Sequence, residues 1–181
     1  EEHYTSVRDM ALISSAVFQY DKFREITGTY QHVIPATNIT AEERYVHQNH
    51  KMLRDWDSRY YEYCVGGKTG YTDQALSTLV TFATKGDVNL VAVVMRTHGG
   101  GNNTYADTRA MLDYAFDNFT KVSVTKDMIG NENIAKVAKD AHVMLPTGVS
   151  ADNLEMKFAA PTEKKDKTGT VAFTYEGQDV G

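Results

Sequence analysis

The chain has 181 residues, and its shares of hydrophobic (41%) and charged (24%) residues are those of a folded globular protein, which excludes a disordered one. Its net charge of −5 includes no block of Lys and Arg that could follow a phosphate backbone, so no nucleic acid is expected as a partner. The single cysteine, Cys64, cannot form an internal disulfide and belongs to no Cys/His cluster, so no zinc or other cofactor is expected.

The first expected element is a helix that follows Ser6. Asp9, three residues later, completes a capping box with this serine. The apolar side chains that then recur at helical spacing are Met10, Ile13, Val17 and Tyr20. Because such a stripe is normally buried against another element, the helix is expected to have been cut from something that it packs against.

Targeting signals are absent from the sequence. The N-terminus, EEHYTSVRDM, lacks the basic and then apolar pattern of a signal peptide, and no run of about 18 apolar residues follows. The protein is therefore expected either to be cytosolic or to begin downstream of its targeting segment.

Two short helices are expected next. Residues 21–40 mix short apolar pieces with turn-forming residues, which predicts a short helix and then an irregular crossing. Thr40 and Glu43 predict a cap for a second helix through RYVHQNHKML, residues 44–53. His47 and His50 would share one face of that helix, where two imidazoles could ligate a metal. Since no third ligand lies at a suitable spacing, exposed histidines without a metal are the alternative.

From Tyr60, apolar and polar residues alternate as they do in a strand, and this alternation leads into VGGKTGYTDQA, residues 65–75. The runs LSTLVTFATK (76–85) and VNLVAVVMRT (88–97) then flank a Lys-Gly-Asp turn and predict a hairpin. Aromatic residues near the first strand could form a stacking surface for a sugar or peptide, or could simply pack; they are Trp56, Tyr60, Tyr61 and Tyr63. Cys64 is expected to be a small buried hydrophobe, with no histidine placed to activate it.

The pattern of apolar residues changes in the last third of the chain. A loop at Gly99–Gly101 precedes an expected helix over residues 104–119, with Asn103 or Thr104 as its cap. Beyond it, the short alternating runs KVSVT, HVML, LEMKF and TVAFTY predict a small all-β module. The expected domains are therefore residues 1–119 and 120–181.

The tripeptide Lys-Thr-Gly occurs twice. With S-x-x-K and S-x-N, it marks penicillin-binding enzymes and serine β-lactamases, in which it lies on a strand beside the nucleophile. Lys68 to Gly70 follows two glycines and precedes an apolar hairpin, so there is room for a ligand beside the cation. An edge strand there could also pair with an extended peptide. Lys167 to Gly169 lies in the charged run EKKDKTG, which is typical of a solvated turn.

No nucleophilic serine is found by its motif. The only S-x-x-K match, Ser123 to Lys126, lies in an alternating run, where residues three apart point to opposite faces of a strand. The motif needs both residues on one helical turn. S-x-N does not occur, so the chain is expected to lack its own catalytic serine and the lysine that accompanies it.

These motifs and their surroundings carry a resemblance. The segments HYTSVRDMALIS, VGGKTGYTDQALSTLVTFATKGDVNLVAVVM and TYADTRAMLDYAFDNF resemble, in order, the segment after S-x-N, the K-T-G hairpin and the closing helix of one family. That family is the low-molecular-weight penicillin-binding proteins, the serine D-alanyl-D-alanine carboxypeptidases of peptidase family S11. The resemblance is essentially end to end, and a serine β-lactamase is disfavoured because it has no trailing β domain.

The resemblance implies an α+β fold. Residues 1–119 would be the C-terminal part of a β-lactamase/transpeptidase-like domain, an antiparallel sheet with flanking helices, and residues 120–181 an incomplete small β domain. Because the family order is S-x-x-K, S-x-N, K-T-G, the chain is expected to be a C-terminal fragment and inactive by itself. Its exposed apolar faces are expected to bind the missing N-terminal segment or another copy.

The resemblance also implies roles for particular residues. Lys68 and Thr69, with Gly70 leaving space, would face the terminal carboxylate of a peptidoglycan stem peptide ending in D-Ala-D-Ala, or the acid of a β-lactam. The amide of Tyr71 would be one oxyanion-hole donor. Thr104 stands where many members have an arginine, which leaves the strength of carboxylate recognition open, since neither Arg96 nor Arg109 is a clear substitute.

Two functions remain after the sequence alone. The first is a serine carboxypeptidase that acts outside the cytoplasmic membrane, in the bacterial cell envelope. The second is a non-catalytic module that keeps the fold in order to bind cell wall or a partner protein. The residues encoded upstream of Glu1 would distinguish them, because only the enzyme needs intact S-x-x-K and S-x-N motifs.

Overall fold

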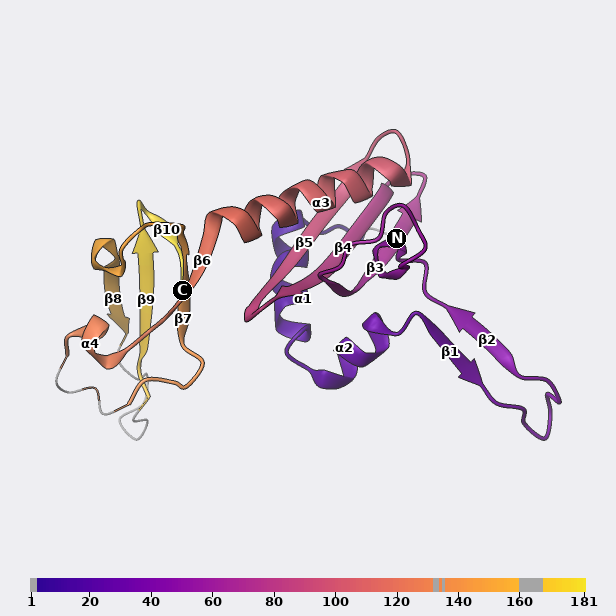
Figure 1. The fold of residues 1–181 in the computed structure, drawn as a ribbon, viewed down its shortest axis with the longest axis horizontal. Coiled ribbons are helices and arrows are strands. Elements are labelled where there is room, and N and C mark those ends of the chain that lie inside the picture. The colour runs from indigo at the N-terminus through magenta and orange to yellow at the C-terminus, as the bar shows by residue number, and fades with distance from the viewer. Residues whose placement is uncertain (1–2, 132–133, 135, 160–167) are drawn as a thin grey trace. The chain divides into compact units, whose positions relative to one another are not determined.

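The computed structural model describes residues 3–131, 134, 136–159 and 168–181. The chain divides into two compact units, residues 1–114 and 115–181, and each is considered by itself. The division lies inside one long helix (Figure 1). The sequence-based domain boundary near residue 120 stays a prediction.

The first unit combines a three-stranded antiparallel sheet, of order β3-β4-β5, with a separate two-stranded hairpin, β1-β2. Its helices are α1 (Val7–Val17), α2 (Asp21–Gly28), the 3-10 turn η1 (Lys51–Leu53) and α3 (Gly101–Asn118), the last of which continues into the second unit. Its strands are β1 (Gln31–Ile34), β2 (Arg44–His47), β3 (Cys64–Thr72), β4 (Leu76–Lys85) and β5 (Val88–Thr97).

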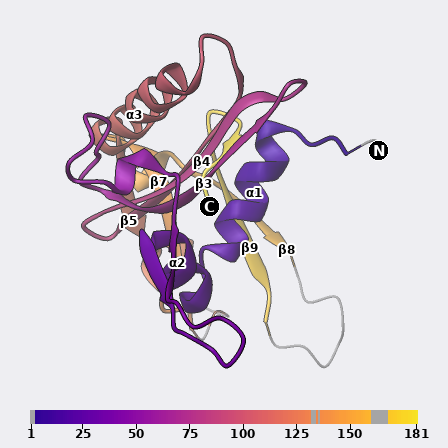
Figure 2. The same ribbon diagram turned by 90° about the vertical axis from the view of Figure 1, so that its right-hand side faces the viewer.

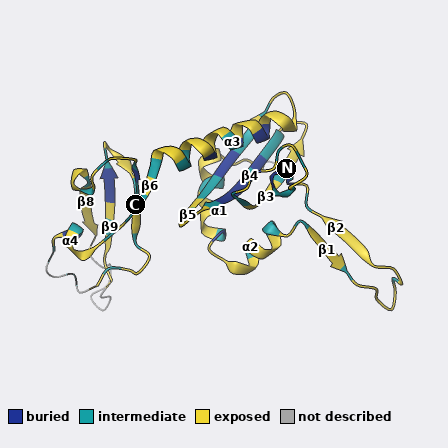
Figure 3. Cartoon of the chain, in the orientation of Figure 1, coloured by how far each residue is buried: buried dark blue, intermediate teal, exposed yellow. Residues whose placement is uncertain are grey.

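The central strand β4 carries much of the buried core, as Figure 3 shows. Its side chains alternate between the two faces of the sheet. On one face the ring of Phe82 stacks on Phe18, which follows α1, with centroids 4.6 Å apart. On the other face Thr81 contacts His50, whose ring meets Tyr105 of α3. The sheet is thus enclosed by α1 and α2 on one side and by α3 on the other (Figure 2).

The predicted cap at Ser6 is confirmed, because the Ser6 hydroxyl accepts the amide of Asp9 at 3.1 Å, while the Asp9 carboxylate accepts the Ser6 hydroxyl at 2.8 Å. The predicted apolar stripe is partly wrong. Met10 and Val17 are half-buried, but Ile13 is 53% and Tyr20 69% exposed, while Ser14 is the buried helical residue. The buried face of the helix is therefore centred on Ser14 rather than on Ile13. Association through the exposed apolar side chains stays a prediction.

The structure corrects the prediction for residues 29–53. The short helix after residue 20 is present as α2, but a β-hairpin replaces both the irregular crossing and the second helix. Within this hairpin Tyr45 lies opposite Val33, and every residue of β2 is exposed. The run RYVH contains aromatic and β-branched residues, which favour strands. Its partner strand lies outside the segment from which the helix was predicted, so the pairing could not be recognised there.

The helix predicted over residues 104–119 begins earlier, at Gly101, so neither Asn103 nor Thr104 is its cap. Of the apolar side chains that predicted it, Leu112 is buried. The remaining buried positions are polar or amphipathic: Thr104, Tyr105 and Thr108. Among the helices of the described residues, none is long and apolar enough to cross a membrane.

The second unit is built mainly of short antiparallel strands. Its elements are β6 (Phe119–Ser123), α4 (Lys126–Ile129), β7 (His142–Pro146), the 3-10 turn η2 (Ala151–Asn153), β8 (Glu155–Ala159), β9 (Thr170–Tyr175) and β10 (Gln178–Asp179). Strands β6 and β7 pair, and β10-β9-β8 form a second sheet. The core of this unit consists of Ile129, Val143, Leu145 and Phe173. The predicted α+β class is confirmed.

Candidate active site on the Lys-Thr-Gly strand

The first Lys-Thr-Gly copy lies on β3, at an edge of the three-stranded sheet. On one side Lys68 is opposite Val80 and Thr69 is opposite Leu79, both on β4. On its other side, β3 has no partner strand within the described residues. Alternate backbone N–H and C=O groups of an edge strand are available to an added extended chain. The predicted position of the motif at a peptide-accepting edge therefore agrees with the sheet order.

The two glycines before Lys68 allow two close approaches. A Cβ at Gly66 would lie 2.9 Å from the Thr27 hydroxyl of α2, and one at Gly67 would lie 2.6 Å from Nε2 of His50. Both distances are shorter than the contacts that a real Cβ atom makes with neighbouring heavy atoms, so a side chain at either position would force a neighbour to move. The glycines thus bring β3 against α2 on one face and against His50 on the other.

A pocket of about 220 Å³ opens beside the strand, and we call it the KTG pocket. Of the four predicted site residues, it includes Thr69 and Gly70, whereas Lys68 and Tyr71 lie outside it and are exposed. The Lys68 ammonium donates to the carbonyl of Thr69. The other residues of the lining are Asn49, Lys51, Ser77, Thr78, Leu79, Gly101, Thr104 and Tyr105.

Thr104 places an unused hydroxyl at this pocket. Its side chain is 3% exposed, and its Oγ1 has no hydrogen-bond partner among the described residues. A buried hydroxyl without a partner costs about 1–3 kcal/mol, so a ligand group that reached it would gain a hydrogen bond. Thr69, Thr78 and the cationic residue Lys51 belong to the same lining, so the pocket combines hydroxyl-bearing residues with a positive charge, which suits an anionic oxygen group.

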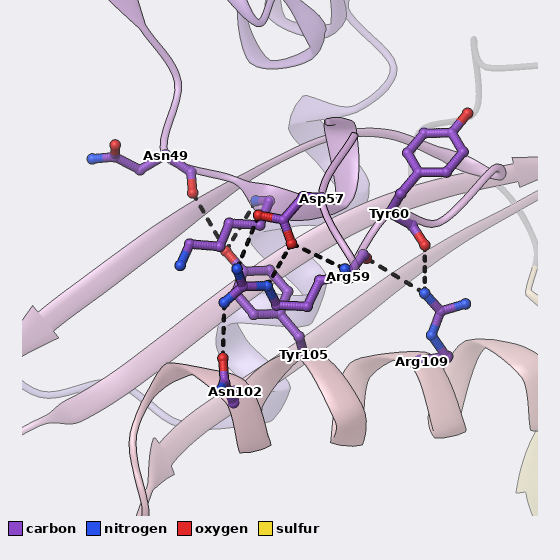
Figure 4. Close-up of polar contacts among 8 residues, drawn as sticks. Asn49, Asp57, Arg59, Tyr60, Asn102, Tyr105 and Arg109 are labelled. Carbon is purple, nitrogen blue, oxygen red and sulfur yellow. Dashed lines mark hydrogen bonds and ion pairs between the residues drawn. The ribbon is translucent and has the colours of Figure 1, made fainter. Parts of the chain in front are cut away.

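The segment that carries Asn49 and Lys51 is held by α3. The Tyr105 hydroxyl accepts the Lys51 amide at 3.0 Å. It also donates to the Asn49 carbonyl at 3.4 Å (Figure 4). Arg59 lies over the Tyr105 ring, 5.8 Å from its centroid, and is itself fixed by Asp57. Sequence reasoning missed these pocket residues, because the contact joins residues 54 positions apart.

Beneath the strand, His50 is fully buried. Its Nε2 is 2.9 Å from the Thr81 hydroxyl, and its Nδ1 has no partner within the described part of the chain. Burial lowers the pKa of His50 from 6.5 to about 4, and the positive charge of Arg54 adds a smaller lowering. The imidazole is therefore neutral at pH 7 and serves as packing for β3.

This buried histidine makes the stability of the first unit depend on pH. Because the folded pKa is about 4 and the ordinary one 6.5, the unfolded chain takes up the proton first as pH falls. The free energy of unfolding is thus expected to fall by about 2 kcal/mol between pH 7 and pH 5. Urea unfolding followed by the fluorescence of Trp56, the single tryptophan, measures it.

A matched pair of variants isolates the contribution of His50. His50→Asn should flatten the dependence between pH 7 and pH 5, whereas His47→Gln should leave it unchanged, because His47 is exposed. An equal slope in the wild type and His50→Asn would contradict the assignment, whatever the absolute stability of the variant.

The two histidines that were considered as metal ligands, and set against the alternative of exposed histidines, do not lie together. His47 lies at the end of β2 and contacts Gln31 at 3.0 Å, whereas His50 is buried at the turn into η1, so the two do not share a helical face. No group of three or more metal-ligating side chains occurs among the described residues.

The aromatic group near β3 is divided, because Tyr61 is buried whereas Trp56 and Tyr60 are 68% and 40% exposed. Tyr61 is 3% exposed and meets the ring of Tyr63 edge to face, while Trp56 meets Tyr30 in the same way. Cys64 is half-buried, and burial raises the pKa of its thiol to about 11, so it stays protonated at neutral pH. This agrees with the expectation of an unreactive cysteine.

The S-x-x-K match does not form the arrangement that its motif needs. Ser123 ends β6, and Lys126 begins α4, so the two do not lie on one helical turn. The second Lys-Thr-Gly copy begins at Lys167, which lies outside the described residues.

Comparisons with known proteins agree with this geometry. The chain is 24% identical to the D-alanyl-D-alanine carboxypeptidase DacF of Bacillus subtilis and 28% identical to DacA of Escherichia coli, over 98% of its own length. It spans about half the length of these curated relatives, 48% and 45%.

Solved structures show the same fold. The chain matches penicillin binding protein 5 from Haemophilus influenzae with a TM-score of 0.63, over 99% of this chain and 54% of that one, at 21% identity. It matches penicillin binding protein 6B from Escherichia coli with a TM-score of 0.61, over 98% and 48%, also at 21% identity.

A family model settles the membership. The model described as Peptidase S11, D-alanyl-D-alanine carboxypeptidase, matches residues 1–99, which is more than half of the chain. The resemblance seen in the sequence is confirmed, and the chain belongs to this family of D-alanyl-D-alanine carboxypeptidases.

Proposed function

We propose that the protein is a serine D-Ala-D-Ala carboxypeptidase of the bacterial cell envelope, and that this chain is the part of it that holds the substrate. The observation that carries the proposal is the edge strand β3, on which Thr69 and Gly70 open into a hydroxyl-lined pocket. The substrate would be a peptidoglycan stem peptide ending in D-Ala-D-Ala, and β-lactams would compete for the same place. The serine nucleophile and its lysine lie outside this chain.

The substrate would bind as an added strand. Its extended backbone would pair with the open edge of β3, and this pairing would place its terminal carboxylate at Thr69 and Lys68. Tyr71 would donate its amide to the developing oxyanion. Loss of one such donor in other enzymes costs about 3–4 kcal/mol of transition-state stabilisation, so this amide alone makes a poor catalyst.

In this proposal, Lys51 takes the role of the arginine that many family members have near the site. In this chain Thr104 occupies the position where many family members have that cation. Thr104 shares the KTG pocket with Lys51, and the pocket lies within the same unit. We infer that Lys51 supplies the positive charge and that the Thr104 hydroxyl donates a hydrogen bond to the same carboxylate.

The proposal is tested by labelling with a fluorescent penicillin. The product of the entire reading frame should be acylated in a stable, one-to-one complex, because it would contain the serine and its lysine. The 181-residue chain alone should not be labelled. Failure of the entire product to label, with intact S-x-x-K and S-x-N motifs upstream, would overturn the carboxypeptidase proposal and favour the binding-module alternative.

A further inference from the structure

A second cleft, of about 400 Å³, lies along α3 beside the loop of residues 57–61. We call it the α3 cleft. Its volume falls in the range of small-ligand sites, and it is larger than the KTG pocket. The residues of its lining that matter here are Arg59, Asn102, Ala106, Arg109, Ala110 and Asp113.

Two opposite charges line this cleft without neutralising each other. Arg109 and Asp113 are four residues apart on α3, a spacing at which an arginine and an aspartate usually attract. Among the ion pairs of the described residues, none joins them. Arg109 instead donates to the carbonyl of Tyr60, as Figure 4 shows, and Asp113 accepts the hydroxyl of Tyr61 at 2.7 Å.

Tyr61 holds the two charges apart. Its ring lies 4.9 Å from the Arg109 guanidinium carbon, and its hydroxyl is bound to Asp113, so it contacts both. Burial raises the pKa of Tyr61, and the hydrogen bond to Asp113 raises it further, so the phenol remains a donor at all physiological pH values. The positions of the guanidinium and the carboxylate are therefore fixed before any ligand arrives.

The rest of the lining adds polarity without further net charge. Arg59 is paired through two nitrogens with Asp57, at 2.6 and 2.9 Å, and donates a third bond to Asn102 at 2.8 Å. Ala106 and Ala110 have the smallest side chains of the lining and leave space over the helix. The cleft thus presents one cation and one anion above a small apolar floor.

We propose that the α3 cleft binds the zwitterionic head group of an α-amino acid, with its carboxylate at Arg109 and its ammonium at Asp113. A free amino acid and the two ends of a very short peptide share this chemistry. The site is argued without β3 or the KTG pocket, and only the choice of D-configured probes comes from the proposed function.

The binding is tested by ¹H–¹⁵N NMR titration of the 181-residue chain. Free D-alanine and the dipeptide D-Ala-D-Ala are the two probes, and they distinguish a free amino acid from a peptide. For a ligand of about six heavy atoms, a dissociation constant on the order of millimolar is expected. Saturable shifts should be confined to residues 57–61 and 102–113, and either probe producing them supports the proposal.

Charge-deleted ligands test the chemistry on an unaltered protein. N-acetyl-D-alanine lacks the ammonium and D-alaninamide lacks the carboxylate, so each should bind at least about tenfold more weakly, the equivalent of 1.4 kcal/mol. Equal binding by these ligands, or no saturable shift with either zwitterion, would overturn the proposal.

Matched variants test the residues. Asp113→Asn and Arg109→Gln should each weaken binding by about tenfold, whereas Asp107→Asn and Arg8→Gln should not, because Asp107 and Arg8 are exposed and outside the lining. Unchanged affinity in both cleft variants would also overturn the proposal. The outcome is separate from that of penicillin labelling, so either proposal can fail alone.

Discussion

Replacement of Gly67 by alanine is expected to destabilise the first unit by about 3 kcal/mol or more. The new methyl carbon would lie 2.5 Å from Cδ2 and 2.6 Å from Nε2 of His50, and would also collide with the carbonyl oxygen of Val80. A backbone oxygen and a fully buried ring cannot move aside without disturbing β4, so the overpacking is severe. Urea unfolding followed by Trp56 fluorescence measures the loss.

Gly101→Ala is the control for this variant. Gly101 begins α3, and a Cβ at this position has no heavy atom within 4 Å. Alanine there should be neutral or stabilise the helix by about 0.5–1 kcal/mol. Equal stabilities of the two alanine variants would show that β3 and His50 do not pack as closely as the structure has them.

Lys68→Ala is expected to slow acylation of the entire gene product by penicillin about 100-fold. A hydrogen bond from a charged group is worth about 1.5–3 kcal/mol, and the loss would be felt in the acylation rate constant. Folding should be retained, because Lys68 is exposed and donates only to the adjacent Thr69 carbonyl among its described contacts. Stopped-flow or quenched labelling with a fluorescent penicillin gives the rate constant.

A ligand without the carboxylate tests the reason for this effect. The methyl ester of the same β-lactam should acylate the wild type and Lys68→Ala at similar rates, since there is no carboxylate for Lys68 to attract. Lys157→Ala, an exposed lysine on β8, should behave like the wild type with both ligands. A 100-fold loss that persists with the ester would assign Lys68 another role.

The sequence predicts local features of this fold well where the signal is short in range. The Ser6 capping box and the hairpin at Gly86, whose φ of 61° favours glycine, both depend on neighbours within a few residues. The glycines before Lys68 also indicated a close approach at this strand, and the structure has one at each of Gly66 and Gly67.

The parts that the sequence could not predict depend on distant partners. The helix predicted over residues 44–53 is wrong because β2 is formed by pairing with β1, whose residues lie outside the segment on which that prediction depends. The KTG pocket joins Lys51 and Thr104, which only the packing of α3 brings together. The buried state of His50 likewise follows from the enclosure by β4 and Tyr105, since histidine by itself favours neither core nor surface.

The β1-β2 hairpin has a consequence for how the first unit opens. Its two strands pair over four residues each, and all but one of these residues are exposed. Little buried apolar surface therefore becomes exposed to water when the two strands separate. Amide protons in β1 and β2 should therefore exchange with solvent through a local opening, far faster than those of β4. The hairpin and the sheet behave as different cooperative units, and a tag inserted at residues 36–42 would leave the core undisturbed.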